Sequence, residues 1–566
     1  MAPTFDALSL AELPPGGSCT RKHGGAQIAL FRLADGAMHA VDNRCPHEGY
    51  PLSQGDISLT PEGPVLTCRW HNWRFKLADG ACLIGGEDVR SYPVRIEGER
   101  VLVDLSPPDP VVEERRLWAS LAVGLQEYDI SRATRDAVRL LVLGVPPARI
   151  AAAAAAHDAR FAEWGATHGL PVAADALRFL PRYPGPRAAI PLAQALDVAA
   201  YAHARRPARV LSPPQDPGPE PLAMAEELAR RVEAEDTAGA EGLLRGALAR
   251  GWGRAELEPA FFTAISAHHT SFGHRLIYQV KVFDLLDAAN WEHAEEILCG
   301  HLYGLIQGTR DDVLPAWASA RRALDSLDLQ ALWELPRSSD WDATSLRSAL
   351  IDERPSGALQ AMLDALQAGP PLDRLCDALS LAGAERMLRF DVAHDANPGL
   401  QDGWLSVTHI QTWSAALRAA VTRWQDPRLL RFFIHGAFFC SHHRVLDGPA
   451  PVSEPQPGSA AELVAAILAR KPEEAMARVL ARPEGFEEAL EDLVLTDVSG
   501  APIVQAHLIK TTLVCLDEAR TMGEDRPLLA LVRFLSSPVR QRWVHQGALE
   551  AIAFVTEGKV PRALAP

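Results

Sequence analysis

The sequence predicts a multidomain protein, with an all-β domain over residues 1–106 and a large all-α domain over residues 116–566. In the first hundred residues, apolar and polar residues alternate in short runs separated by Asp-Gly and Glu-Gly turns, a pattern typical of strands. From about Glu113 onward, apolar residues recur at i, i+3, i+4 and i+7, as they do in amphipathic helices. A proline-rich linker, residues 107–115, is expected to join the two regions.

Five segments of the N-terminal domain have the composition of β-strands. Each is short and alternates apolar with polar side chains, and glycine-containing turns follow several of them. The expected strands are residues 27–33, 38–41, 73–77, 92–96 and 100–104.

Two short segments of this domain each carry one cysteine and one histidine, Cys45 with His47 and Cys68 with His71. Four mixed ligands of this kind can form a tetrahedral zinc site. A Rieske [2Fe–2S] centre instead needs two cysteines on one iron and two histidines on the other. Because each segment supplies one residue of each type, the pattern favours the iron–sulfur centre.

The residues around these four ligands carry a family resemblance. Residues 45–49, Cys-Pro-His-Glu-Gly, and residues 68–75, Cys-Arg-Trp-His-Asn-Trp-Arg-Phe, resemble the two cluster-binding loops of Rieske ferredoxins. The resemblance implies a Rieske-type [2Fe–2S] cluster, with the cysteines on the iron that stays ferric and the histidines on the iron that changes valence. It also implies a role in electron transfer.

Three positions depart from other Rieske proteins. Those of respiratory complexes carry an extra cysteine in each loop, and the two form a disulfide. Here the corresponding places hold Tyr50 and Arg69, so no such bridge is expected. Asn72 stands where a glycine usually follows the second histidine.

The region beyond the linker is rich in Ala, Leu, Arg and Glu and has no strand pattern. Residues 460–480 form an amphipathic helical stretch that Lys471-Pro472 interrupts. An all-α region argues against the usual aromatic-ring Rieske dioxygenase, whose catalytic domain is built around a large antiparallel sheet.

The helical region loosely repeats one feature, a histidine at the start of an apolar helical segment. A helix N-terminus opposes positive charge, so each imidazole is expected to be neutral, the form that binds iron or donates a hydrogen bond. If the helices converge, these histidines would surround a catalytic pocket; otherwise they are hydrogen-bonded core residues. The four histidines are His168, His274, His409 and His507, and the helix caps expected upstream are Thr167, Ser271 and Thr408.

Further histidines follow or precede these four. His203, His301, His435 and His545 come later in each repeat. His269 precedes His274 at the spacing that classical Rieske oxygenases use for mononuclear iron. A five-residue step turns about 140° on an ideal helix, so this pair is not expected to share a face.

The segments around His168, His274 and His507 are similar to the repeated histidine-containing helices of questin oxidase-like proteins, over most of residues 116–566. The resemblance implies Baeyer–Villiger-type oxygen insertion into an anthraquinone ring, with a reduced nicotinamide as electron source and no flavin motif. This chain differs by carrying its own iron–sulfur domain, through which its electrons are expected to pass.

Composition limits the partners and the compartment. Lys+Arg 56 against Asp+Glu 72 gives a net charge of −16, which disfavours nucleic acid as a partner. The sequence has no apolar run long enough to span a membrane and no signal-peptide pattern at Met1, so a cytoplasmic protein without a membrane partner is expected. It also has no glycine-rich phosphate-binding loop, so electrons should come from a separate NAD(P)H-dependent reductase or ferredoxin.

These observations lead to one main hypothesis, an oxygenase (monooxygenase) that acts on an apolar aromatic or quinone-like small-molecule substrate. Its cluster would relay electrons to the helical domain, where some of the four repeated histidines would hold an additional non-haem iron. Two alternatives remain at this point: an electron-transfer protein whose helical domain docks a partner enzyme, and a helical scaffold whose cluster senses redox state.

Overall fold

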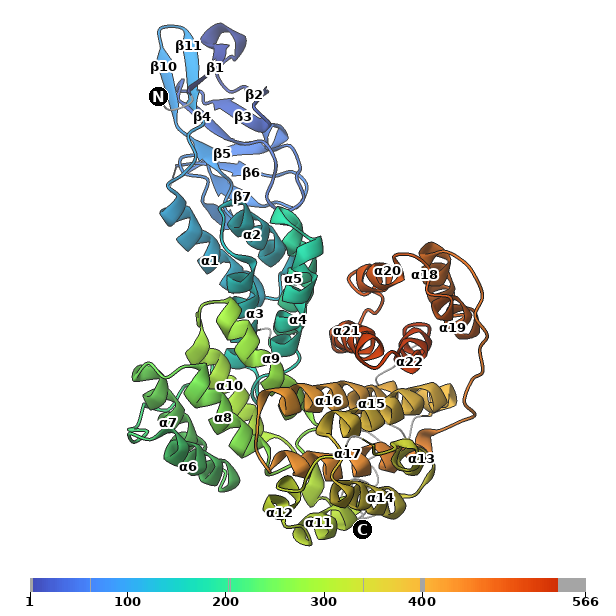
Figure 1. The fold of residues 1–566 in the computed structure, drawn as a ribbon. Coiled ribbons are helices and arrows are strands. Elements are labelled where there is room, and N and C mark those ends of the chain that lie inside the picture. The colour runs from blue at the N-terminus through green and yellow to red at the C-terminus, as the bar shows by residue number, and fades with distance from the viewer. Residues whose placement is uncertain are drawn as a thin grey trace, which may run out of the picture. The chain divides into compact units, whose positions relative to one another are not determined.

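The computed structural model describes residues 4–537, except for positions 62, 202, 204, 339 and 398–402. The chain divides into two compact units, Met1–Gly144 and Val145–Pro566. All strands among the described residues lie in the first unit and the second is helical, which confirms the predicted fold class (Figure 1). The units part after Gly144, so the first two helices group with the strands, and the first of them begins at Pro110, inside the expected linker.

The strands of the first unit pair antiparallel in three sheets, with the orders β1-β11-β10, β2-β3-β4-β9 and β5-β6-β7-β8. Four of the predicted strands match β3, β4, β7 and β11 to within one residue at each end. The fifth is divided at Pro93, which has no N–H for a sheet ladder. The strands are β1 Thr4–Ser9, β2 Ser18–His23, β3 Ala26–Arg32, β4 Met38–Asp42, β5 Asp56–Thr60, β6 Gly63–Thr67, β7 Arg74–Lys76, β8 Cys82–Ile84, β9 Ser91–Tyr92, β10 Val94–Glu97 and β11 Arg100–Asp104.

Strand β3 serves two apolar cores because its side chains alternate between its faces. Ile28 and Leu30 pack in one core, together with residues of β1 and β11. Ala29 and Phe31 pack in the other core, which includes Cys45 and Cys68. The two cysteines of the predicted cluster site are therefore anchored in a packed interior.

Helices α1 (Pro110–Gln126) and α2 (Ile130–Val142) complete the first unit. Asp109 caps α1 by accepting hydrogen bonds from the first backbone N–H groups, and Pro110 opens the helix. Glu87, whose side chain is buried, forms ion pairs with Arg135 and Arg139 of α2, both at 2.7 Å. These pairs connect the helical hairpin to the β domain.

The second unit consists of α-helices joined by loops and short 3₁₀ turns. Proline begins several of them, including α19, which starts where the sequence predicts an interruption. The first eight are α3 Pro147–Phe161, α4 Gly169–Phe179, α5 Ala189–Tyr201, α6 Pro221–Glu233, α7 Thr237–Ala249, α8 Arg254–Ile265, α9 His274–Ala288 and α10 Ala294–Gln307. The others described are α11 Ala318–Asp325, α12 Leu329–Trp333, α13 Thr344–Asp352, α14 Pro355–Ala368, α15 Leu372–Arg389, α16 Trp404–Arg423, α17 Leu429–His442, α18 Ala460–Leu468, α19 Pro472–Leu480, α20 Phe486–Leu493, α21 Pro502–Met522 and α22 Arg526–Leu535.

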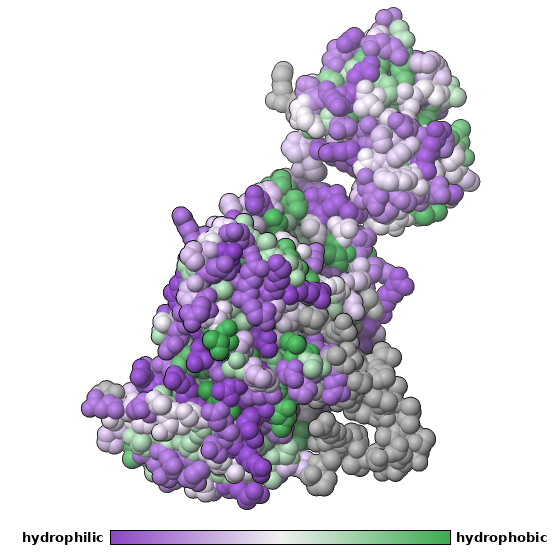
Figure 2. All heavy atoms as spheres, turned by 90° about the vertical axis from the view of Figure 1, so that its right-hand side faces the viewer, coloured by the Kyte–Doolittle hydropathy of each residue, from purple (hydrophilic) through white to green (hydrophobic). Residues whose placement is uncertain are grey.

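Four of these helices, α4, α9, α16 and α21, form a closed bundle in which each packs against two of the others (Figure 1). On the face drawn in Figure 2, hydrophilic side chains predominate and apolar ones form small groups. Within the described residues, no helix has the length and apolar character required to span a bilayer.

Candidate functional sites

The first site is built from two loops with the same backbone design. In each, the cysteine N–H donates across the loop to a carbonyl, Cys45 to Tyr50 at 2.9 Å and Cys68 to Trp73 at 2.8 Å. The cysteine carbonyl accepts from a residue four positions later, Gly49 in the first loop and Asn72 in the second.

Gly49 and Asn72 both have a left-handed backbone, with φ of 77° and 59°. Asparagine is one of the few residues other than glycine that adopts this conformation readily. Asn72 therefore fits the position at which a glycine is usual, and the loop keeps its geometry.

The four predicted ligands lie together as a buried pair and a solvent-facing pair. Cys45 and Cys68 are 4% and 1% exposed, whereas His71 is exposed and His47 is partly so. The Nδ1 atoms of the two histidines face each other at 3.0 Å. Trp73 stacks on His47.

The chemistry of these donors suits a cluster that binds cysteine on one side and histidine on the other. Burial raises the pKa of the Cys45 thiol to about 12, although the backbone N–H groups of His47 and Glu48 act in the opposite direction. A thiol so placed stays neutral unless a bound cation stabilises its thiolate. Two imidazole nitrogens 3.0 Å apart likewise need a proton or a metal between or beside them.

The second site is a ring formed by the four repeated histidines of the helical unit. One ring nitrogen of each lies within 4.8 Å of those of the other three. His409 Nε2 is 2.7 Å from His274 Nε2 and 3.1 Å from His507 Nε2. His168 completes the ring, with its imidazole centroid 4.7 Å from that of His274 and 4.6 Å from that of His507. We call these four residues the histidine ring.

Hydrogen bonds within their own helices fix the tautomers of two ring members. His409 Nδ1 donates to the Leu405 carbonyl at 2.6 Å, and His507 Nδ1 donates to the Ile503 carbonyl at 2.7 Å. A carbonyl oxygen can only accept, so each Nδ1 carries the hydrogen and each neutral imidazole presents an Nε2 lone pair. Two lone pairs 3.1 Å apart repel each other, and a shared cation relieves that repulsion.

Protonation of the ring is opposed by its surroundings. Burial holds the pKa of all four imidazoles well below the ordinary value near 6.5, and for His168 the nearby Lys510 amine acts in the same direction. Lys510 Nζ lies 3.5 Å from His168 Nε2 and is itself fully buried. Neutral imidazole is the metal-binding form, and imidazole suits iron, copper, zinc and nickel. The ring therefore has the donor chemistry of a metal site.

The structure brings the four histidines together but changes the expected local details. His168 and His274 stand at helix starts as predicted, whereas His409 and His507 lie inside α16 and α21. The prediction that all four open helices was wrong for the latter two, because those helices begin further upstream. The argument from the helix N-terminus therefore applies only to His168 and His274, and burial keeps the other two neutral.

The predicted caps were also wrong. Helices α4, α9 and α16 have no side-chain cap. Thr167 donates its hydroxyl to Asp158 at 2.5 Å, which holds the turn before His168. Thr408 lies within α16 and donates to the Leu405 carbonyl.

The later histidines of each repeat stand outside the ring. His301 is buried in α10 and bonds to the Gln279 side chain at 3.0 Å. His435 is fully buried in α17, and neither of its ring nitrogens has a partner within the described structure. His203 bonds to Asp158 at 2.9 Å. His545 lies outside the described residues.

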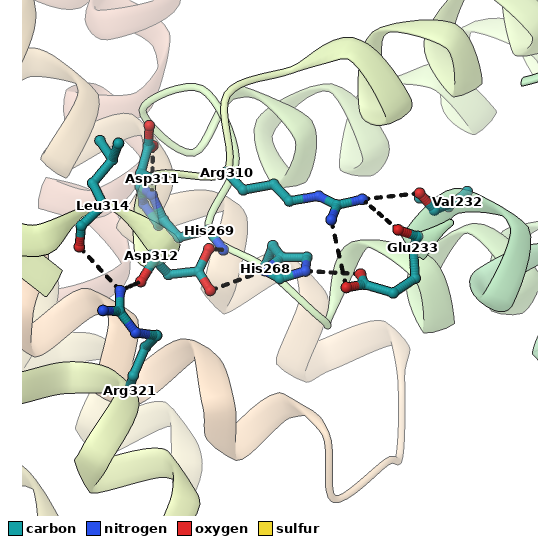
Figure 3. A network of polar contacts seen from close by, with 9 residues as sticks. All are labelled: Val232, Glu233, His268, His269, Arg310, Asp311, Asp312, Leu314 and Arg321. Carbon is teal, nitrogen blue, oxygen red and sulfur yellow. Dashed lines mark hydrogen bonds and ion pairs between the residues drawn. The ribbon is translucent and has the colours of Figure 1, made fainter. Parts of the chain in front are cut away.

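His268 and His269 form a separate acidic network rather than a part of the ring (Figure 3). His269 Nδ1 donates to Asp311, and His268 lies between Asp312 and Glu233, each contact at 2.9 Å. Burial lowers the pKa of His268, but the hydrogen bonds to the two carboxylates outweigh it and raise the pKa overall. The pair His269 and His274 therefore does not form one metal site, in agreement with the sequence argument.

Sequence reasoning did not single out the residues immediately around the ring. Lys510 follows His507 by less than one helical turn, and Asp158 anchors the turn before His168. Lysine and aspartate are ordinary surface residues by composition, and only their burial in the fold marks them.

Comparisons with known proteins identify the first unit. Residues 4–93 match the family model of the Rieske [2Fe-2S] domain. The chain is 35% identical over 104 residues to the ferredoxin component of a naphthalene 1,2-dioxygenase system from Pseudomonas aeruginosa, covering 18% of this chain and 95% of that protein. It is 38% identical over 101 residues to a 4beta-methylsterol monooxygenase from Methylococcus capsulatus, covering 16% of this chain and 26% of that protein.

Among solved structures, the ferredoxin of carbazole 1,9a-dioxygenase from Nocardioides aromaticivorans IC177 is 26% identical, with a TM-score of 0.17. That match covers 18% of this chain and 96% of the ferredoxin.

The fold and donors of the first unit thus define an iron–sulfur electron-transfer domain. Through this domain the chain belongs to the Rieske [2Fe–2S] family, and it carries a [2Fe–2S] cluster. Its domain is homologous to ferredoxin components of oxygenase systems and to part of a sterol monooxygenase. The similarity of the helical unit to questin oxidase-like proteins stays a prediction.

Proposed function

We propose that the protein is an oxygenase in which the Rieske cluster supplies electrons to a metal held by the histidine ring. Cys45, His47, Cys68 and His71 would bind the cluster. His168, His274, His409 and His507 would bind a non-haem iron, which when present supplies the means to activate O₂. The substrate would be an apolar aromatic or quinone-like molecule.

The observation that carries this proposal is the pair of Nε2 lone pairs on His409 and His507, 3.1 Å apart in a buried site. Both imidazoles are oriented by hydrogen bonds from Nδ1 to backbone carbonyls. Such outer hydrogen bonds fix the tautomer and orientation of metal-binding histidines in known sites. Four neutral donors with no carboxylate among them leave the full positive charge on a bound divalent ion.

The surrounding residues would shield the site from water. Phe272 stacks on His409, with ring centroids 5.9 Å apart, and Tyr278 lies 5.4 Å from His274. Arg275 is buried and donates to the Ala166 carbonyl. The two aromatic contacts help to hold His409 and His274 in place before any substrate binds, and such preorganisation is a general requirement of catalytic sites.

The proposed reaction has a simple electron balance. Insertion of one oxygen atom of O₂ into the substrate, with the second leaving as water, consumes two electrons and two protons. A Rieske cluster carries one electron at a time, so a separate NAD(P)H-dependent reductase or ferredoxin would reduce it twice in each turnover.

The proposal can be tested with ¹⁸O₂. The full-length protein, reduced through an added ferredoxin reductase, would be incubated with a panel of fused aromatic and quinone compounds, and the products would be analysed by mass spectrometry. We expect ¹⁸O in a product from the wild type and none from His507→Gln, whose cluster should still be reduced normally. The matched control is His301→Gln, which changes a buried histidine outside the ring. Incorporation by His507→Gln at the wild-type level would refute the proposal.

A second function, electron transfer to a partner enzyme, is favoured by the similarity to a dioxygenase ferredoxin over 95% of its length. In that case the cluster would be reduced and would pass electrons to an added oxygenase, while His507→Gln would leave this transfer unchanged.

A further inference from the structure

The bundle that carries the histidine ring also encloses a cavity. Its volume is about 540 Å³, within the range of small-molecule sites, and it is lined by residues of α4, α9, α16 and α21. In each helix the lining residues lie C-terminal to the ring histidine. In all four helices the cavity therefore lies on the C-terminal side of the ring.

The spacing from ring to cavity is the same in all four helices. Seven residues after each histidine, a side chain lines the cavity, which is two helical turns or about 10 Å further along that helix. These residues are Asp175 after His168, Lys281 after His274, Ala416 after His409 and Val514 after His507. Ile277 and Thr412 also line the cavity, only three residues after His274 and His409.

The cavity has a buried inner end and an exposed mouth. Ile277 and Thr412 are buried, whereas Arg178, Asp284 and Arg423 are exposed. At the mouth, Arg178 pairs with Asp517 and Arg423 with Asp284, both at 2.7 Å. The charges at the mouth are thus neutralised in pairs, and a neutral molecule meets no excess of either sign there.

The walls between these ends are mostly small and apolar, with one buried polar pair. Alanines of three helices line the cavity, which leaves flat surfaces between the helices. The exception is Lys281, which forms an ion pair with buried Asp175. An ammonium group has three N–H donors, and Asp175 accepts one, so Lys281 can donate to a ligand in the cavity.

We propose that this cavity is the substrate site of the proposed oxygenase, and that Lys281 positions the substrate by donating a hydrogen bond to its oxygen. The inference rests on the proposed function for its link to the ring. The ligand it fits is an apolar, flat ring compound with one hydrogen-bond-accepting oxygen, a carbonyl or a phenol. Asp175 holds the Lys281 side chain, and the apolar body lies against the alanines.

The test compares two fluorescent probes of the same shape, 1-hydroxypyrene and pyrene, on the full-length protein after incubation with ferrous iron and desalting. A hydrogen bond to a charged donor makes a difference of about 10- to 100-fold in affinity. We therefore expect the wild type to bind 1-hydroxypyrene at least 10-fold more tightly than pyrene. In Asp175→Asn/Lys281→Met, which leaves no unpaired buried charge, the preference should fall to about 2-fold or less while pyrene still binds.

Two further variants test the cavity itself. Ala419→Phe should narrow the cavity and weaken the binding of both probes at least 10-fold. Ala288→Trp at the exposed mouth should weaken the binding of both probes at least 10-fold. Because Ala288 is exposed, this change should not disturb the packing of the core. Ala469→Trp, at the exposed end of α18, is the matched control and should bind as the wild type does.

Equal binding of the two probes to the wild type, or an unchanged preference in the double variant, would overturn the role of Lys281. Unchanged binding to Ala419→Phe and Ala288→Trp would overturn the cavity as the site. Metal content, measured on the same samples, separates this inference from the proposed function. If the histidine ring holds no metal but the probes bind as predicted, only the proposed function is contradicted. If the ring holds metal but the variants bind both probes as the wild type does, only the inference about the cavity is contradicted.

Discussion

The cluster loops and the histidine ring present similar donors in opposite surroundings. In both sites imidazole nitrogens face each other, at 3.0 Å in the loops and at 2.7 and 3.1 Å in the ring. In the loops the histidines reach solvent and only the cysteines are buried, whereas the ring lies inside a helical bundle. An exposed ligand suits electron exchange with a partner, and a shielded one suits chemistry that water would disturb. On the proposed function, the same side chain would serve different tasks according to its access to water.

The two sites also differ in how the chain builds them. Cys45 to His71 lie in neighbouring loops of one small domain, and each loop closes by local backbone hydrogen bonds. The ring gathers residues from His168 to His507 and depends on the packing of four helices. If the sites are independent, each can be removed without loss of the other.

The largest effect is expected from Cys68→Ser. This change removes a buried thiolate ligand, so the visible absorption and acid-labile sulfide of the cluster should be lost, while the helical unit keeps its metal. Cys82→Ser is the matched control, because Cys82 is a partly buried thiol packed against the same core. A Cys68→Ser protein that retains a full cluster spectrum would remove this cysteine from the site.

Loss of one ring histidine should weaken metal binding by more than the 10- to 100-fold typical of an outer-shell change. A metal that binds the folded state raises the melting temperature. A chelator should therefore lower the melting temperature of the wild type and of His301→Gln, but leave that of His409→Gln unchanged. If the chelator lowers the melting temperature of His409→Gln as much as that of the wild type, the ring does not hold the metal.

The helical unit should lose stability as the pH falls below 6.5. Burial lowers the pKa of His301 and His435 to about 3, and that of His157 and His443 to about 4. Below pH 6.5 these histidines bind protons in the unfolded chain but not in the folded protein. The free energy of unfolding therefore decreases as the pH decreases. Each residue contributes up to about 1.4 kcal/mol per pH unit until its folded pKa is reached.

Urea unfolding between pH 7 and pH 5 measures this slope. His435→Leu should reduce the slope by the contribution of one residue. Near pH 7 the change should be neutral or stabilising, because neither ring nitrogen of His435 has a hydrogen-bond partner among the residues that the structure describes. A free energy of unfolding that does not change over this range would contradict the prediction.

The smallest effect is expected at Asn72, where the backbone is left-handed. Asn72→Gly should change the free energy of unfolding by less than about 0.5 kcal/mol, whereas Asn72→Ala should lower it by about 1 kcal/mol. Thermal unfolding of the two variants, followed with the cluster chromophore, gives the comparison. Equal stability of the Ala and Gly variants would show that the conformation is not strained.

The sequence predicted those features of the fold and of the sites that depend on residues close together in the chain. The alternation in β3 and β11, the break at Pro472 and the spacing of Cys45, His47, Cys68 and His71 are all signals within a few residues. The short strands β5 and β8 were not predicted, because Asp56–Thr60 and Cys82–Ile84 are largely exposed or too short to show a period.

The ring was only partly predictable. Its histidines stood out as a repeat. However, no local sequence feature distinguishes His507, which belongs to the ring, from His301, which bonds to Gln279. The helix starts near His409 and His507 were missed, although Pro502 at the first position of α21 is a signal of a helix start. Lys281 and Asp175, more than a hundred residues apart, meet only in the folded bundle.

The central claim is that one chain carries two separate metal centres, and the ratio of metal to acid-labile sulfide tests it most directly. In the full-length protein after cluster reconstitution and desalting, we expect two sulfides, two irons of the cluster and one further metal ion per chain. His409→Gln should lose only the further metal ion. A total of two irons and two sulfides, with no other metal in the wild type, would contradict the account.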